Sequence, residues 1–321
     1  MEWLSETDIA DLVDRDLALE AVETVFVAMD AGEAESFPVV REAIGHREAL
    51  YGFKSGFDRN AMTLGVKAGG YWPQNSGHGL ANHQSTVLLF DPETGACNAL
   101  VAGNRLTALR TAAAAATSIR HLAPPQSRVL GILGAGHQAG WQLEAALDVG
   151  AFTDVLAWNH RPGCTRALEA IAERRGCRFR EVSLPELGER SDVVITITSS
   201  FSPLLADEHV VGPTHIAAMG TDTVGKQELE PALVARARCF AELPAQSAQL
   251  GECQHAVMQG LIAESDIASL GGVIAGRMPG RQPHEVTLFD GSGVGLQDLA
   301  VARAALERAR VRDRLRQIDP G

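Results

Sequence analysis

The chain of 321 residues carries 28 lysine and arginine residues against 40 aspartate and glutamate residues, a net charge of −12. Nucleic acids and acidic membrane surfaces select basic proteins, so neither is expected as a main partner. No run approaches the roughly 20 apolar residues of a membrane-spanning helix, and the acidic amino terminus does not resemble a signal peptide. Five scattered cysteines, without CxxC or HExxH, argue against disulfides and a metal site and favour the reducing cytoplasm.

The first 123 residues predict an α+β domain that begins with a helix. Ser5 and Asp8 resemble a capping box, and apolar residues then recur at helical spacing, so we expect one helix from Ser5 to Met29. From residue 37 onward, short extended runs alternate with glycine, proline and asparagine, as is typical of an antiparallel sheet. The expected strands are Pro38–Val40, Leu50–Phe53, Thr63–Ala68, Ser85–Phe90 and Ala99–Ala102.

An alanine-rich helix is expected to close this domain. Thr107 can cap it, alanine is the best helix former, and the pattern continues to about Leu122, before a linker at Pro124-Pro125. Residues 124–295 then alternate between strand and helix, which predicts a doubly wound parallel sheet of the Rossmann type. A charged amphipathic helix from Leu296 to Arg314 lies in the last segment, 296–321, which we expect to join the first domain.

A glycine-rich turn at the start of the second domain is typical of a dinucleotide site. The turn lies between a strand predicted at Val129–Leu133 and a helix predicted at Gln138–Val149. The first glycine allows a tight turn, the second lets backbone approach a pyrophosphate, and a small last residue lets helix and strand pack closely. The helix N-terminus would then present free amides to the phosphates. The residues of the turn are Gly134, Ala135, Gly136, His137, Gln138 and Ala139.

The end of the next predicted strand, Val155–Trp158, bears on the choice between NAD and NADP. An NAD site usually places Asp or Glu just after it, whereas this chain has Asn159 and Arg161 there. These residues favour NADP, although Arg161 could equally be a solvated loop residue. Thr198, at the end of the predicted strand Val193–Thr198, is a further candidate for cofactor binding.

Several motifs occur in an order that resembles one known family. They are Val66–Pro73, the turn Asp91–Gly95, Leu106–Ala113, the glycine-rich turn at 134–139, Gly220–Asp222 and Leu288–Gly293. Together they resemble the ornithine cyclodeaminase/mu-crystallin family, in order from about residue 38 to residue 299. The combination of the RTAA run that starts at Arg110 with an aspartate after the fifth Rossmann strand is fairly specific, whereas each piece alone is not.

This resemblance implies a Rossmann domain, an antiparallel substrate domain that also forms a homodimer, and hydride transfer at the carbon–nitrogen bond of a small anionic imine or amino acid. By position, Arg41, Lys67 and Arg110 would hold the substrate carboxylate. Asp222 would be the acid–base carboxylate, with Lys67 as its partner in proton transfer. The chemistry fits, because arginine presents a planar fork to a carboxylate and Arg110 is expected in the first helical turn, where anions are favoured.

The strand that holds Gly52 and Lys54 bears on the substrate. The resemblance implies that ornithine-using members have an acidic residue here, which would match the distal amine. Here Gly52 takes that position and Lys54 is close by, a change that suits a second carboxylate, although Lys54 could equally be an exposed strand lysine. The runs Val39–Ala43, Phe53–Asp58 and Gly70–Pro73 also resemble the iminosuccinate reductase branch of the family, which makes aspartate and favours NADH.

The expectation that fits these residues best is NAD(P)H-dependent reduction of iminosuccinate to L-aspartate. Other chemistries of the family stay open at this point: an ornithine cyclodeaminase-type lyase with catalytic NAD, or a ketimine or pyrroline-2-carboxylate reductase. A ligand-binding protein like mu-crystallin, which turns nothing over, is the non-enzymatic alternative. The sequence leaves the exact substrate, the choice of NAD or NADP and the physiological direction open.

Overall fold

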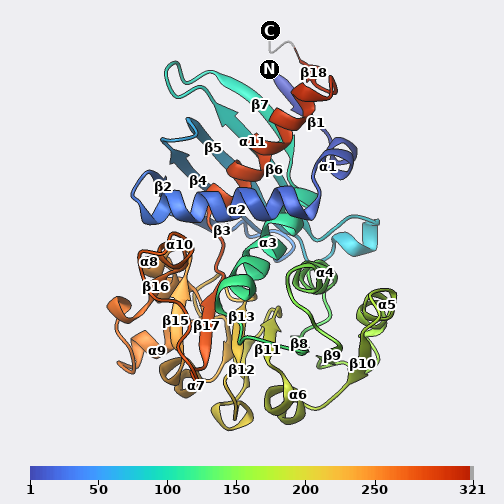
Figure 1. Ribbon diagram of the computed structural model, residues 1–321. Coiled ribbons are helices and arrows are strands. Elements are labelled where there is room, and N and C mark those ends of the chain that lie inside the picture. Colours follow the sequence, from blue (N-terminus) through green and yellow to red (C-terminus); the bar gives the residue numbers. More distant parts are fainter. Residues whose placement is uncertain (319–321) are drawn as a thin grey trace. The chain divides into compact units, whose positions relative to one another are not determined.

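Two large sheets organise the chain, one in each of two units (Figure 1). The structure, a computed structural model, describes residues 1–318. Unit 1 comprises residues 1–110 and 294–318, and unit 2 comprises residues 111–293. The first division falls inside helix α3 (Asn104–Leu122), directly after Arg110, whereas the sequence placed the boundary after residue 123. The chain returns to unit 1 at Val294, close to the expected position.

Unit 1 is built on an eight-stranded sheet that is antiparallel except where β1 pairs with β7. The strand order is β18-β1-β7-β6-β5-β4-β2, and β3 also pairs with β4. This confirms the predicted α+β fold. The strands are β1 (Glu2–Leu4), β2 (Ala34–Ser36), β3 (Val40–Ala43), β4 (Leu50–Asp58), β5 (Thr63–Tyr71), β6 (His83–Phe90), β7 (Cys97–Ala102) and β18 (Arg316–Gln317).

The helix expected from Ser5 to Met29 is in fact two helices, α1 (Glu6–Leu12) and α2 (Arg15–Asp30). The predicted capping box of Ser5 and Asp8 is present at the start of α1. The break was missed because Asp14 adopts an extended conformation and accepts a hydrogen bond from the amide of Leu17 at 2.8 Å. An aspartate in that geometry begins a new helix, although the apolar spacing runs on across it.

Helix α3 begins at Asn104, three residues before the expected cap. Thr107 is therefore inside the helix, and its hydroxyl lies 3.3 Å from the hydroxyl of Ser85. Arg110 consequently lies beyond the first turn, so the predicted contribution of the helix dipole at this position was wrong, because that effect is confined to the terminal turn.

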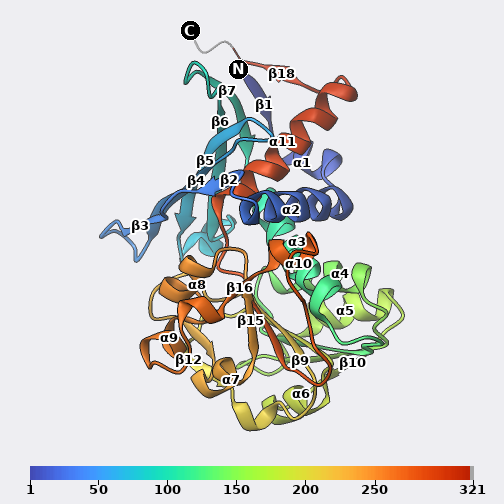
Figure 2. The same cartoon turned by 60° about the vertical axis from the view of Figure 1, so that its left-hand side comes forward.

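Helix α11 (Gly295–Val311) packs on one face of the unit 1 sheet (Figure 2). Two glycines of the sheet make room for it. A Cβ at Gly56 would lie 2.9 Å from Cγ of Leu296, and a Cβ at Gly65 would lie 2.8 Å from Cδ2 of Leu299. Glycine in a strand often marks such a close approach. Side chains alternate between faces along a strand, so Lys54 and Lys67 share this helix-covered face with the two glycines.

Unit 2 is a parallel sheet with the strand order β10-β9-β8-β11-β13-β17-β15-β16, as labelled in Figure 1. The strands are β8 (Val129–Leu133), β9 (Asp154–Trp158), β10 (Arg178–Glu181), β11 (Val193–Thr196), β13 (His215–Ala218), β15 (Arg238–Ala241), β16 (Ala268–Ser269) and β17 (Thr287–Asp290). A small parallel pair is formed by β12 (Phe201–Leu205) and β14 (Gln227–Leu229). The predicted doubly wound fold is confirmed, and the order reverses around β8, where such sheets bind ligands.

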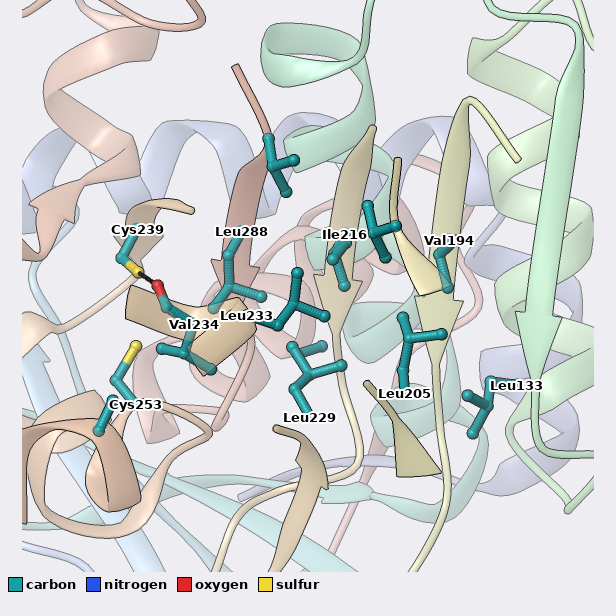
Figure 3. Packing of buried hydrophobic residues seen from close by; sticks show 14 of the residues in the cluster. Leu133, Val194, Leu205, Ile216, Leu229, Leu233, Val234, Cys239, Cys253 and Leu288 are labelled. Carbon is teal, nitrogen blue, oxygen red and sulfur yellow. Dashed lines mark hydrogen bonds between the residues drawn. The ribbon is translucent and has the colours of Figure 1, made fainter. Parts of the chain in front are cut away.

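Helices and apolar side chains complete unit 2. The helices are α4 (Ala139–Val149), α5 (Arg166–Arg174), α6 (Leu184–Arg190), α7 (Pro231–Arg236), α8 (Pro244–Leu250), α9 (Gln254–Met258) and α10 (Leu270–Ile274). In the core, Val194, Ile216 and Leu288 come from three neighbouring strands and meet Leu229 and Leu233 (Figure 3). No helix within residues 1–318 combines the length and apolar character needed to cross a membrane.

We expect Gly56→Ala to lower the free energy of unfolding by about 1–3 kcal/mol, the usual cost of overpacking. The added methyl would lie 2.7 Å from the carbonyl oxygen of Glu35 as well as against Leu296. Urea unfolding measures the change. Gly77→Ala is the matched control, because a Cβ there meets nothing within 4 Å. Equal stability of the two variants would contradict the close packing of α11 on β4.

Candidate active site

Two lysines face each other on neighbouring strands of unit 1. Lys54 of β4 and Lys67 of β5 are direct partners in the antiparallel register, and only 8% and 7% of their surfaces are exposed. Direct partners point to the same face with Cβ atoms about 4.5–5.5 Å apart, and like charges at that spacing repel. Lys54 is therefore not an exposed strand lysine, and the pair requires a nearby anion.

That anion is Asp298, a fully buried residue of α11 that no sequence motif indicated. Its Oδ2 lies 2.8 Å from Nζ of Lys67, and its Oδ1 lies 3.2 Å from Nε of Arg110. The hydroxyl of Thr107 donates to the same Oδ1 at 3.3 Å. Arg110 also donates from Nη1 to Oε1 of Gln297 at 2.8 Å. The structure thus brings together three predicted residues, Lys54, Lys67 and Arg110, around an unpredicted carboxylate.

Mutual electrostatics set the protonation of this cluster. Burial, followed by the positive charge of Arg110, lowers the pKa of Lys67 to about 8, although Asp298 opposes the change. Burial would raise the pKa of Asp298, but the positive charges of Arg110 and Lys67 outweigh burial and lower it. Near neutral pH, Asp298 is therefore ionised and Lys67 is mostly protonated. Lys67 lies close to the range in which it could exchange a proton.

Arg41 belongs to the same face of the sheet. It pairs with Gly52, Gly52 pairs with Gly69, and Gly69 pairs with Ser85, so two glycines lie between the arginine and the serine. A Cβ at Gly52 would lie 1.9 Å from the carbonyl oxygen of Val40, so β3 approaches too closely for any side chain. The positive charge of Arg41 also lowers the pKa of Lys67, which places it near the cluster, although its own side chain is exposed.

We call Arg41, Lys54, Lys67 and Arg110 the cationic face of unit 1. Lys67 and Arg110 share the carboxylate of Asp298, and Lys54 and Arg41 bring further positive charge to the same face. Charge that is held away from water is costly unless it is paired, and carboxylates are the partners that arginine and lysine side chains bind most strongly. The face is therefore suited to a small, strongly anionic ligand.

In unit 2, the glycine-rich turn has the geometry that a dinucleotide needs. Gly134 adopts φ +111°, and a Cβ there would lie 2.7 Å from the carbonyl oxygen of Ile197, so only glycine fits. A Cβ at Gly136 would meet nothing within 4 Å, which leaves the second glycine open to a ligand. Ala139 is buried at the start of α4, and no side chain caps that helix. A helix N-terminus without a side-chain cap fits the phosphates of a dinucleotide.

The other expected cofactor residues lie at the same edge of the sheet. The side-chain amide of Asn159 donates to the carbonyl oxygen of Arg161 at 3.0 Å and so stabilises the loop that holds both residues. The side chain of Arg161 is exposed. Thr198 lies beside the turn, since a Cβ at Gly134 would lie 3.0 Å from its Cγ2. Within residues 1–318, no group of three or more His, Cys, Asp or Glu residues is arranged to hold a metal ion.

Asp222 follows β13, as predicted, and its carboxylate forms an ion pair. Its Oδ1 lies 2.8 Å from Nζ of Lys226 and accepts a hydrogen bond from the hydroxyl of Thr223 at 3.2 Å. Lys226 also donates to the carbonyl oxygen of Gly220 at 3.3 Å. The ion pair holds the carboxylate of Asp222 in one direction. Sequence reasoning missed Lys226, although a lysine four residues after an aspartate is a local signal for such a pair.

Two buried glutamates, which sequence reasoning missed, hold the loops around Thr198 and Asp222. Glu228 accepts hydrogen bonds from the hydroxyl of Thr196 and the amides of Thr198 and Gly220, at 2.6, 2.6 and 2.9 Å. Glu252 accepts from the hydroxyl of Thr221 and from the amides of Glu228 and Leu229. Burial raises the pKa of both carboxyls, and the negative charge of Glu228 adds to the effect on Glu252. The loops after β11 and β13 are thus tied to a common support.

Known proteins share this combination of units. The model of the ornithine cyclodeaminase/mu-crystallin family matches residues 2–313. The chain belongs to this family. The family resemblance drawn from the motifs is therefore confirmed over nearly the whole chain.

Individual members of the family are similar to this chain to different degrees. The iminosuccinate reductase of Paracoccus denitrificans (strain Pd 1222) is 59% identical over 307 residues, which cover 96% of this chain and 96% of that protein. The alanine dehydrogenase of Archaeoglobus fulgidus is 34% identical over 95% of this chain and 94% of that protein. The crystal structure of the Paracoccus denitrificans iminosuccinate reductase in complex with NAD+ has a TM-score of 0.96, at 57% identity and 99% coverage of both chains.

Proposed function

We propose that this chain is an imine reductase that uses NADH to convert iminosuccinate to L-aspartate. The observation that carries the proposal is the cationic face of unit 1, in which Lys67 and Arg110 hold the carboxylate of Asp298 while Lys54 and Arg41 add positive charge beside them. A dicarboxylate compensates more of this charge than a monocarboxylate, and a diamine would add to it. The 59% identity to an iminosuccinate reductase supports the same substrate.

Each cation has a part in this proposal that follows from its position. Arg110 is anchored through Nε and Nη1, so its guanidinium plane is fixed for the α-carboxylate. Lys67 and Arg41 add positive charge beside it, and Lys54, the direct partner of Lys67, meets the distal carboxylate. Unit 1 is thus the substrate-binding unit.

Unit 2 holds the dinucleotide on the turn 134–139, with Asn159, Arg161 and Thr198 at the same edge. NADH, when bound, supplies the hydride that reduces an imine carbon. The crystal structure of the similar Paracoccus denitrificans enzyme contains NAD+, which supports NAD(H) over NADP(H) despite the exposed Arg161. Asp222, oriented by Lys226, manages the proton on the substrate nitrogen.

The direct test is the loss of NADH absorbance with a panel of imines, repeated with NADPH. The panel contains iminosuccinate, pyruvate with ammonia, and pyrroline-2-carboxylate, and ornithine is tested separately for ammonia release. We expect rapid oxidation of NADH with iminosuccinate and little with the monocarboxylates. Ammonia from ornithine without net change in NADH would show a cyclodeaminase instead.

The matched variant for this assay is Lys54→Met, which keeps the length of the side chain and removes its charge. A hydrogen bond to a charged group contributes about 1.5–3 kcal/mol, so KM for iminosuccinate should rise by roughly tenfold or more. Activity with pyruvate and ammonia, which offers no distal carboxylate, should not change. An equal effect on both substrates would show that Lys54 does not select the second carboxylate.

Asp222→Asn removes the proposed acid–base carboxylate while it keeps the shape of the side chain. We expect turnover to fall by about 10²–10⁴-fold, the usual contribution of general acid–base catalysis. NADH binding, followed by the fluorescence of the bound cofactor, should persist because the turn 134–139 is unchanged. Normal turnover in this variant would overturn the assignment.

We also propose that the chain forms a homodimer through the face of the unit 1 sheet opposite α11. Val40, Tyr51 and Phe53 share this face and are 37%, 41% and 40% exposed. The cross-strand neighbours Val66, Leu88 and Leu100 are only partly buried. An apolar area of this kind fits an identical face of a second copy. A monomeric mass by analytical ultracentrifugation would contradict this proposal.

A further inference from the structure

We propose that Asp298 is a positioning residue, which sets the spacing of Lys67 and Arg110, the two cations that receive the substrate's α-carboxylate, and keeps Lys67 charged. The inference deepens the proposed function and rests on it for the identity of the bound anion. Each carboxylate oxygen of Asp298 contacts a different cation. Oδ2 lies 2.8 Å from Nζ of Lys67, and Oδ1 lies 3.2 Å from Nε of Arg110. One planar carboxylate thus fixes the relative position of a strand residue and a helix residue.

The contacts on the far side of Asp298 hold the carboxylate itself in place. Its side chain is fully buried, and Thr107 of α3 donates to Oδ1 at 3.3 Å. The preceding residue, Gln297, accepts from Nη1 of Arg110 at 2.8 Å, so Arg110 meets two consecutive residues of α11. Two attachments leave little freedom to the guanidinium plane. The direction in which Arg110 presents its remaining N–H groups therefore depends on the first turn of α11.

The charges around Lys67 explain why a carboxylate is needed here. Lys54 faces it from β4, Arg110 from α3, and the positive charge of Arg41 reaches it from β3, whereas its partner on β6 is the apolar Val87. The negative charge of Asp298 opposes the effect of Arg110 and Arg41 on the pKa of Lys67. Without Asp298, these two positive charges and burial would together favour the neutral amine. A neutral Lys67 would contribute no charge to the binding of an anion.

The experiment compares Asp298→Asn and Asp298→Glu with the wild-type protein. Asparagine keeps the shape but places an N–H₂ group against Lys67 or Arg110, both of which are donors. We expect kcat/KM for iminosuccinate to fall by about 10–100-fold, the scale on which the outer partners of a site act. As the pH rises, the wild type should lose activity near the pKa of Lys67, about 8. Asp298→Asn should lose activity at a lower pH. An opposite charge within about 4–6 Å shifts a pKa by about 1–3 pH units, so the decline should move down by at least about one unit.

Asp298→Glu separates charge from position. It keeps the negative charge in the cluster, so the pH at which activity declines should stay within a few tenths of a unit of the wild type. The longer side chain displaces the cations, so KM should still rise. A pH profile that moves as far in Asp298→Glu as in Asp298→Asn would overturn the role of the charge. A KM unchanged in both variants would overturn the role in positioning.

The matched control is Asp8→Asn, which removes another buried carboxylate of unit 1. Asp8 accepts hydrogen bonds from Ser5 and lies 3.5 Å from Arg316, so its loss should destabilise the fold. A loss of stability alone does not alter the protonation of Lys67. Asp8→Asn should therefore lower Tm and leave the pH profile and KM unchanged. The same shift of the pH profile in Asp8→Asn would show that the effect of Asp298 is merely structural.

A second readout needs no substrate and separates this inference from the proposed function. Trace acetylation with acetic anhydride, followed by mass spectrometry of the peptide that contains Lys67, reports the neutral amine as a function of pH. The midpoint should be near 8 in the wild type and lower by about one unit or more in Asp298→Asn. If iminosuccinate is not reduced but this midpoint moves, the proposed function fails and the role of Asp298 stands. A midpoint that is the same in both proteins would overturn the role of Asp298.

Discussion

Unit 1 depends on one constraint, which is that positive charges held close together and away from water must share a carboxylate. Lys67 comes from β5, Arg110 from α3 and Asp298 from α11, so the cluster joins three separate parts of the chain. A buried ion pair of this kind is weak as a source of stability, because desolvation offsets the attraction. Its value lies in geometry, since removal of any one member leaves the others badly paired.

Unit 2 solves a comparable problem with hydrogen bonds in place of ion pairs. The loops after β11 and β13 carry buried and partly buried amides and hydroxyls that must be hydrogen-bonded without a regular ladder. Glu228 and Glu252 accept hydrogen bonds from these groups, so loops distant in sequence have a common support. Buried carboxylates are costly unless they are satisfied in this way. In both units, buried acids define where the exposed chemistry can lie.

Much of the fold could be predicted from the sequence because local patterns determine it. Val129–Leu133 is a continuous apolar run, and β8 has the predicted bounds; the glycine-rich turn that follows has the strained φ that requires glycine. One helix was predicted in place of α1 and α2 because the apolar spacing is the same on both sides of Asp14. Only the extended conformation of that residue separates the two helices.

The candidate site was predictable where a residue has a distinctive type or position, and not where its role comes from its partners. Lys67, Arg110 and Asp222 stand within motifs, so they could be named in advance. Asp298 looks like any acidic residue in a charged amphipathic helix, and the same sequence fits a solvent-facing side chain. Its burial follows from the packing of α11 on β4 and β5, which is long-range and leaves no local pattern.

The close approach of β3 to Gly52 limits how the specificity of this protein can change. Because the carbonyl oxygen of Val40 occupies the space of a Cβ, no side chain can be introduced there while the edge strand keeps its register. A change in the charge of the accepted substrate at this position would thus require a rearrangement of the backbone. Evolution toward a substrate with a basic tail would therefore have to remodel β3 first, because a single substitution at position 52 would clash with the backbone of that strand.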